Sequence, residues 1–242
     1  MDQEKPQTES AHSLPHPLRE FVFVGIIIAL FAIMLVGSIQ LGYIQISKQE
    51  QGKHPIYKKA MATYFWVGEK SGRDNNYIAN TESYFDEKWQ EHYGGVDDPQ
   101  KRCGSKPCDF TPRENPFYFA LPYGERGDND NWKPDAKLVP WYSQEIKNLG
   151  KSLLKNRWIE VFYVNKTCYA QWEDVGPLFE DDFAYVFGTS TLPKNKENNH
   201  AGLDLSPAMW DCLGLKENDY TEWRFVEMKD VPAGPWRGII TK

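Results

Sequence analysis

The stretch from Phe21 to Ile46 is the feature that most restricts this chain, because its 26 residues include no Asp, Glu, Lys, Arg or His. As an α-helix it spans about 39 Å, enough to cross a hydrocarbon layer of about 30 Å. A helix that is apolar on every side must be buried on every side, and lipid provides that burial. A mostly polar segment precedes the run and Gly37-Ser38-Ile39 is a poor cleavage site, which favours a retained span over a cleaved signal peptide or a soluble core helix. The sequence predicts one transmembrane helix over residues 21–46.

The segments on either side of this run are polar. Residues 1–20 have three prolines and no periodic apolar pattern, so we expect a disordered tail, and residues 47–59 read as a linker. Lys and Arg are more frequent on the C-terminal flank, which by itself favours a cytoplasmic C-terminal side. Long domains, however, are translocated largely regardless of flanking charge. The cysteines and the resemblance described below favour export, so we expect a single-pass protein of the inner membrane with its C-terminal domain in the periplasm.

Residues 60–242 are predicted to form one β-rich domain. Aromatic residues make up 14% of the chain, and short apolar or aromatic runs alternate with turn residues. Strands are expected at residues 61–67, 158–164, 168–172, 183–187 and 223–228, the second and third joined as a hairpin. One helix is indicated by Ser206 as N-cap, Pro207 at the first helical position and Gly214 at the end. Strands at this spacing are typical of a small barrel or sandwich.

Charge and cysteine content exclude some functions and leave others open. The net charge is −6, which argues against a nucleic-acid partner, since that would need a basic surface. Cys103 and Cys108 flank a four-residue loop and are predicted to form a disulfide, whereas Cys168 and Cys212 are either buried thiols or a second bridge. Paired C-x-x-C motifs and Cys/His clusters are absent from the sequence, so we expect no metal site and no cofactor.

Two short motifs carry a resemblance to a known superfamily. They are Gln-Trp-Glu-Asp-Val-Gly-Pro at 171–177 and Gly-Leu-Asp-Leu-Ser-Pro-Ala at 202–208, the second followed by Leu-Gly-Leu at 213–215. In this order they resemble the double-psi β-barrel domains of rare-lipoprotein-A-like proteins, expansins and related endoglucanases. The resemblance implies a mainly β fold, a six-stranded double-psi barrel with short helices and long loops, and a groove that binds polysaccharide. Further segments, ENPFYFALPYGE and VPAGPW, are similar to a group of bacterial membrane-anchored proteins.

The resemblance also implies roles for particular residues. Asp174 is the catalytic candidate, a general acid on a glycosidic bond, and Asp204 is its acidic partner. Taken from the residues alone, Asp174 is equally a turn aspartate before Gly-Pro, and Asp204 a carboxylate near a helix start. Trp172, Tyr118 and Tyr185 are the aromatic residues expected to line a sugar groove. Val175 replaces the family's arginine and Tyr118 takes the place of its histidine, and both differences weigh against catalysis.

Two functions follow as expectations. The first is an envelope protein that binds a cell-wall glycan such as peptidoglycan, or an envelope partner protein, without cleaving it. The second is a glycan-cleaving enzyme, a lytic transglycosylase or glycoside hydrolase, that uses Asp174. A lytic reaction needs only one carboxyl, because a hydroxyl of the sugar itself attacks, whereas hydrolysis needs two.

Overall fold

The computed structural model describes residues 57–242, which belong to a unit spanning Pro55–Lys242. The predicted tail at 1–20, the predicted transmembrane run at 21–46 and most of the predicted linker lie outside the described residues. Among residues 57–242, no helix is long and apolar enough to cross a bilayer.

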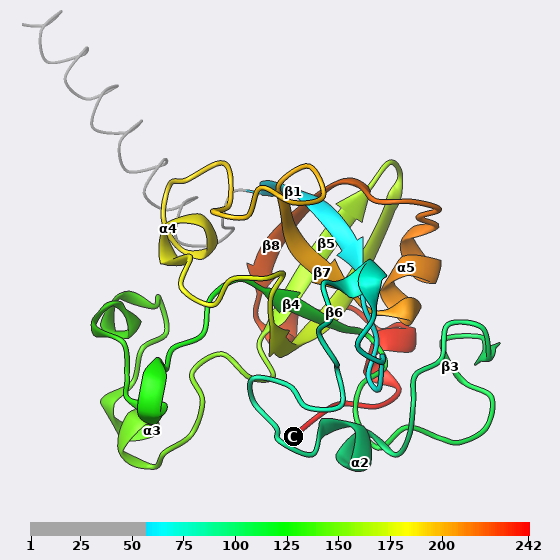
Figure 1. Cartoon of the computed structure of the whole chain (residues 1–242), viewed down its shortest axis with the longest axis horizontal. Coiled ribbons are helices and arrows are strands. Elements are labelled where there is room, and N and C mark those ends of the chain that lie inside the picture. Colours follow the sequence, from blue (N-terminus) through cyan, green and yellow to red (C-terminus); the bar gives the residue numbers. More distant parts are fainter. Residues whose placement is uncertain (1–56) are drawn as a thin grey trace, which may run out of the picture. The chain divides into compact units, whose positions relative to one another are not determined.

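Six strands close into a mixed β-barrel, as Figure 1 shows. They are β1 (Lys58–Tyr64), β4 (Tyr118–Leu121), β5 (Trp158–Tyr163), β6 (Lys166–Val175), β7 (Ala201–Leu205) and β8 (Asp219–Val226). Around the barrel the order is β1-β7-β4-β6-β5-β8. The pairs β1–β7 and β4–β6 are parallel, and the other pairs are antiparallel. The expectation of a mainly β fold built on a closed six-stranded barrel is therefore confirmed.

The pairing pattern has an internal twofold relation. Exchanging β1 with β6, β4 with β7 and β5 with β8 turns every pair in the barrel into another pair of the same direction. The first three strands thus make the same set of neighbours as the last three. Each parallel pair joins a strand of one half to a strand of the other, so neither half can close its sheet alone.

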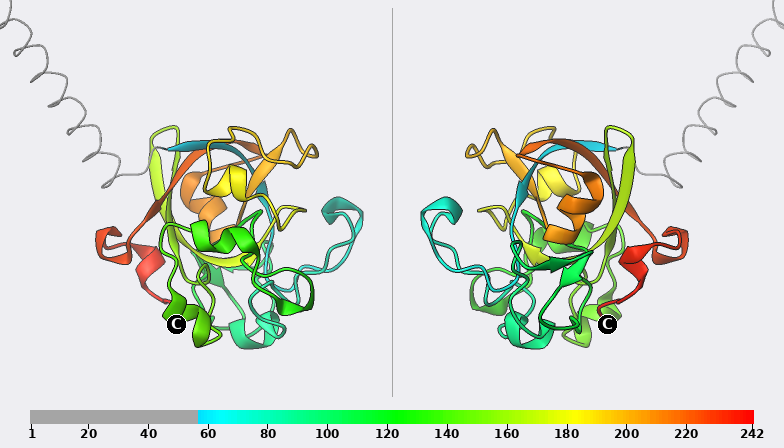
Figure 2. Two further views of the ribbon diagram at one scale, coloured as in Figure 1. Left: turned by 90° about the vertical axis from the view of Figure 1, so that its left-hand side faces the viewer. Right: turned by 90° about the vertical axis from the view of Figure 1, so that its right-hand side faces the viewer.

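Short elements fill the connections between these strands. They are the α-helices α2 (Trp89–Tyr93), α3 (Gln144–Asn148), α4 (Phe183–Val186) and α5 (Pro207–Leu213), the small hairpin β2 (Arg102–Cys103) and β3 (Lys106–Pro107), and the 3-10 turns η1 (Arg73–Asn75), η2 (Asp128–Asp130), η3 (Pro134–Leu138), η4 (Met228–Asp230) and η5 (Pro235–Arg237). Figure 2 shows α4 across one opening of the ring of strands and α5 across the other. Both helices bury apolar side chains in the barrel core, and so help to close its two ends.

Helix α5 forms where the sequence predicts it. The Ser206 hydroxyl accepts a hydrogen bond from the Met209 N–H, Pro207 opens the helix, and Gly214 ends it with φ of 78° in the left-handed region. The predicted strand at 183–187 is wrong, because its first four residues form α4. Asp182 caps this helix by accepting from the Tyr185 N–H, and that local bond favours a helical turn over an extended chain.

Two hydrophobic clusters lie on opposite sides of β4. Phe119 and Leu121 belong to the main cluster, which fills the barrel. Tyr118 and Ala120, which alternate with them, belong to a second cluster formed with side chains of the long connection from residue 65 to 117. This connection carries α2 and the β2–β3 hairpin, and it covers the face of β4 that is directed away from the main core.

Candidate functional site

Asp174 and Asp204 lie on two strands that flank the same central strand. Ala120 of β4 is the register partner of Asp174 on β6 and also of Asp204 on β7. Residues opposite each other on paired strands project to the same face, so the two carboxyl groups share a face with Ala120 between them. Two interstrand spacings, about 10 Å, separate their Cα atoms. Ala120 has the smallest side chain of the three and is 1% exposed.

This row of residues is on the side of the barrel wall away from the main core. Three residues close to this row in sequence belong to the main cluster. They are Phe119, which precedes Ala120, Leu205, which follows Asp204, and Trp172, which lies two residues before Asp174. Since side chains alternate between faces along a strand, Ala120 next to Phe119 and Asp204 next to Leu205 point the other way. At β6 a register shift between Phe119 and Ala120 skips Glu173 and brings Asp174 opposite Ala120. The local irregularity thus directs Asp174 to the same face as Ala120 and Asp204.

Asp204 is held by β1 and by a glycine. Thr63 is its register partner on β1, and the Thr63 hydroxyl donates a hydrogen bond to Asp204 Oδ1. A Cβ atom added at Gly176 would lie 3.3 Å from Asp204 Oδ2 and 3.9 Å from the Cβ of Ala120. Glycine at position 176 therefore leaves the second oxygen of Asp204 room that a side chain would take.

Asp174 is fixed by backbone donors. The N–H groups of Tyr84 and Val175 each donate to Asp174 Oδ1 at 2.8 Å. The Tyr84 hydroxyl is in turn anchored to the backbone of Arg126, accepting from its N–H and donating to its carbonyl oxygen, both at 2.7 Å. One of the two donors that orient the Asp174 carboxyl group consequently lies 90 residues away in the sequence.

Burial raises the pKa values of both carboxyl groups. The pKa of Asp174 rises to about 7, chiefly through burial and further through the nearby charge of Asp204, against the opposing effect of its two N–H donors. The pKa of Asp204 rises to about 6 through burial, while the hydrogen bond from Thr63 acts to lower it. Between these two pKa values Asp174 is mostly protonated and Asp204 mostly ionised, so one group can donate a proton and the other can accept one.

The two aspartates line a small cleft, which we call the acid cleft and define by Thr63, Glu69, Asn75, Asp174, Gly176 and Asp204. Its volume is about 120 Å³. Glu69 is a third carboxyl in this cleft. Burial raises its pKa to about 7, and the amides of Asn75 and Asn80 oppose this shift. The Asn80 amide donates to Glu69 Oε2 at 2.8 Å.

Glu69 and Thr63 were not among the residues that the sequence singled out. Both belong to the run that begins with the predicted strand 61–67, Thr63 within it and Glu69 just after it. Glu69 follows Gly68 and lies two positions past the end of the predicted strand. Such a position is only a weak sequence signal for a functional residue. Only the pairing of β1 with β7 shows that the end of this strand reaches Asp204.

The three aromatic residues expected to line a sugar groove are core residues in the structure. Trp172 and Tyr118 are 0% exposed and Tyr185 is 1% exposed. The Trp172 ring packs against Phe225 and Phe119 in the barrel, so it has no free face for a ligand. Large aromatic surfaces gain more by burial in a core than at a water-filled groove, and these three strand and helix positions all face a core.

Tyr118 connects two segments near the site through its hydroxyl group. Its hydroxyl donates to Asp97 Oδ2 and accepts from the Val67 N–H, each at 3.0 Å. Asp97 is itself fully buried and paired with Arg102. One buried hydroxyl therefore joins the segment after β1 to the segment after α2.

All four cysteines form disulfide bonds. Cys103 is joined to Cys108 across the turn of the β2–β3 hairpin, and Cys168 on β6 to Cys212 on α5. The second bridge settles, within the structure, the alternative that the sequence left open. It ties α5 to the strand that carries Asp174.

Within residues 57–242, no three His, Cys, Asp or Glu side chains are grouped so as to hold a metal ion. No protein-family model matches the chain, and no curated protein shows significant similarity to it. The side chains that line the acid cleft offer carboxyl groups, amides and the Thr63 hydroxyl.

Proposed function

We propose that the described domain is a double-psi β-barrel of the rare-lipoprotein-A-like and expansin type. The twofold relation among the strand pairs supports this, because each parallel pair crosses between two equivalent halves of three strands. The position of the two motifs supports it as well. The first ends β6, the second covers β7 and the start of α5, and the two therefore meet on either side of β4.

We further propose that the domain binds a polysaccharide chain of the cell envelope, such as peptidoglycan, at the acid cleft. One observation carries this proposal: three carboxyl groups, from Glu69, Asp174 and Asp204, line a single cleft that is open to solvent. Carboxyl and amide groups fixed by backbone and side-chain donors are suited to accept and donate hydrogen bonds to sugar hydroxyls. The N-terminal run would hold this domain at the membrane.

Cleavage of the bound glycan is the second candidate function, and the raised pKa of Asp174 favours it. With a pKa of about 7, much of Asp174 is protonated near neutral pH and can give its proton to the glycosidic oxygen. The bond from that oxygen to the anomeric carbon then breaks, and a hydroxyl of the same sugar attacks the carbon. The proton of that hydroxyl passes to a carboxylate, a role that we propose for Asp204. The product is an anhydro sugar and a new chain end.

One experiment tests both proposals. The full-length protein in detergent is mixed with insoluble peptidoglycan, and both sedimentation of the protein and release of soluble muropeptides are measured. Sedimentation without release supports binding alone. Release that is greatest between about pH 6 and pH 7, and that falls at least 100-fold in Asp174→Asn with sedimentation retained, supports cleavage. A protein that neither sediments nor releases muropeptides contradicts both.

A further inference from the structure

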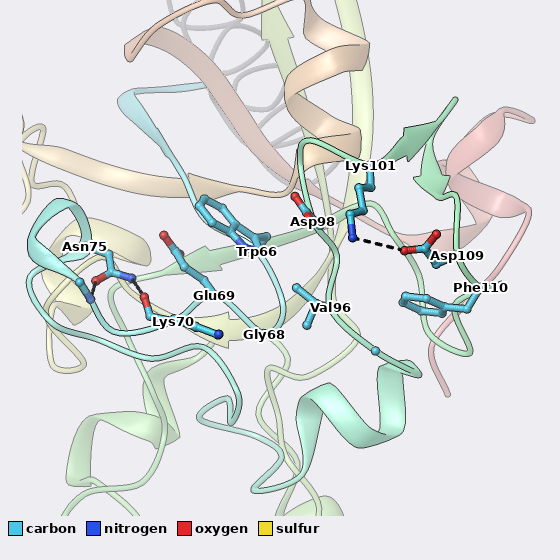
Figure 3. A pocket seen from close by; sticks show the side chains of 12 residues that line it. Trp66, Gly68, Glu69, Lys70, Asn75, Val96, Asp98, Lys101, Asp109 and Phe110 are labelled. Atoms are coloured by element: carbon cyan, nitrogen blue, oxygen red, sulfur yellow. Dashed lines mark hydrogen bonds and ion pairs between the residues drawn. The ribbon is translucent and has the colours of Figure 1, made fainter.

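A second and larger cleft lies beside the acid cleft. Figure 3 shows it between the segment that follows β1 and the segment from Gly95 to Phe110. We call it the loop cleft and define it by Trp66, Glu69, Lys70, Asn75, Asp98 and Phe110. Its volume is about 770 Å³, compared with about 120 Å³ for the acid cleft.

The two clefts share part of their lining. Glu69 and Asn75 line both, so the clefts meet at these side chains. In Figure 3, Asn75 lies at one end of the loop cleft and Phe110 at the other, with Glu69 between them. A long ligand that extends from the acid cleft into the loop cleft passes Glu69 and Asn75.

The lining of the loop cleft suits a neutral chain that carries both hydroxyl groups and apolar faces. The rings of Trp66 and Phe110 are half-buried, so each keeps an accessible part in the cleft. Acidic and basic side chains are mixed, and Lys101 pairs with Asp109 at 3.7 Å. A mixed lining gives no advantage to a polyanion or a polycation. Aromatic rings beside polar groups are the combination that pairs with the apolar face and the hydroxyl edge of a sugar.

The walls of the loop cleft are held in place before any ligand binds. The Gly68 N–H donates to the Asn80 carbonyl at 2.7 Å, and the Asp97 N–H donates to the Val67 carbonyl at 2.9 Å. Gly68 has φ of 76°, and a Cβ atom there would lie 2.9 Å from Val96. Glycine is thus needed for the close approach of the two walls, and a preformed cleft loses less conformational entropy when it binds.

We propose that the loop cleft binds the sugars that continue beyond the acid cleft, with Trp66 and Phe110 as the contact surfaces. The ligand is then a linear glycan of several sugars, and a disaccharide does not fill the site. This inference rests on the proposed binding of glycan at the acid cleft, and it adds the length of ligand that the protein selects.

The test compares short and long glycans. Full-length Asp174→Asn protein in detergent, which prevents cleavage during the measurement, is titrated calorimetrically with peptidoglycan glycan strands of two and of eight sugars. We expect the longer strand to bind at least 10-fold more tightly. Trp66→Ala in the same background should remove most of this gain and leave binding of the disaccharide nearly unchanged. Trp66→Phe, which keeps a ring, should restore part of it.

The matched control is Tyr220→Ala, which removes an aromatic ring that is 44% exposed on β8 and lines neither cleft. It should bind both strands as the parent does. Equal affinity for the two glycan strands overturns the inference but leaves the proposed function standing. The same holds if Trp66→Ala keeps the full gain in affinity for the longer strand. If neither glycan strand binds, both this inference and the proposed function fail. Equal melting temperatures for the variants show that a loss of affinity is not a loss of folding.

Discussion

At the scale of single residues, the protein separates its acidic groups by environment. Asp174 and Asp204 reach an open cleft, whereas their neighbour Glu173 is 1% exposed and neither of its carboxylate oxygens has a hydrogen-bond partner among the described residues. Burial raises the pKa of Glu173 to about 8, against the opposing charge of Lys155. Glu173 is the residue skipped by the register shift on β6, so the same irregularity that directs Asp174 outward leaves Glu173 buried.

Replacing Glu173 by Gln should make stability less dependent on pH. A carboxyl whose pKa is about 8 when folded and about 4.5 when unfolded binds more protons in the folded state. Its contribution to stability is therefore lost progressively as pH rises from about 4.5 to about 8, by up to about 5 kcal/mol. In urea unfolding, Glu173→Gln should match the parent at pH 4.5 and exceed it by several kcal/mol at pH 8.5. Equal pH slopes for the two proteins would contradict this.

Tyr118→Phe should destabilise the domain although it removes only one oxygen atom. The hydroxyl bonds both Asp97 and the Val67 N–H, and its loss leaves both without this partner in a buried place. We expect a loss of about 1–3 kcal/mol in the free energy of unfolding. Tyr220→Phe, at an exposed position, serves as the control and should change stability by less than about 0.5 kcal/mol. A loss as small as the control's would show that the buried hydroxyl is unimportant.

At the scale of elements, β4 organises the site although it has four residues. It separates the two strands that carry the aspartates, and each of its faces packs on a different cluster. The connection that follows β1 covers its outer face and forms both walls of the loop cleft. The Cys103–Cys108 bridge closes the hairpin whose flanking residues, Lys101 and Asp109, lie in one of those walls. The Cys168–Cys212 bridge instead fastens a helix to the barrel.

The two disulfides should therefore differ in what they stabilise. Closing a loop with a sequence separation of 44 removes more unfolded-state entropy than closing one with a separation of 5, by about 4 against about 2 kcal/mol. Cys168→Ser with Cys212→Ser should lower global stability by the larger amount. Cys103→Ser with Cys108→Ser should lower it less, but should weaken glycan binding more. Denaturant unfolding and sedimentation with peptidoglycan measure the two effects. A larger loss of stability in Cys103→Ser with Cys108→Ser, or a larger loss of glycan binding in Cys168→Ser with Cys212→Ser, would contradict this prediction.

At the scale of the whole molecule, we propose a polypeptide held at a membrane by residues 21–46, with an oxidised barrel domain on the periplasmic side. Two disulfides in one domain agree with an oxidising compartment, where such bonds persist. The net charge of −6 argues against a nucleic-acid partner, which would need a basic surface.

Deleting residues 21–46 should move the protein from the membrane fraction to the soluble fraction and leave it in the cytoplasm. In this state the cysteines should remain reduced, which alkylation of free thiols in intact cells would detect. Replacing the same residues with an unrelated transmembrane segment of equal orientation is the control, and it should restore both membrane fractionation and oxidation. Full-length protein that is recovered in the soluble fraction would contradict the predicted span.

Sequence alone was sufficient for what depends on neighbouring residues. The cap, proline and glycine of α5 each act on the backbone next to them, and short aromatic and apolar runs separated by turn residues are enough to predict a β-rich domain, so these expectations hold. Tertiary structure decided what depends on distant pairing. The burial of Trp172, Tyr118 and Tyr185 and the place of Glu69 and Thr63 beside Asp204 follow from which distant segments meet. Residues far apart in a chain come together only through such pairing, and no local pattern of side chains encodes it.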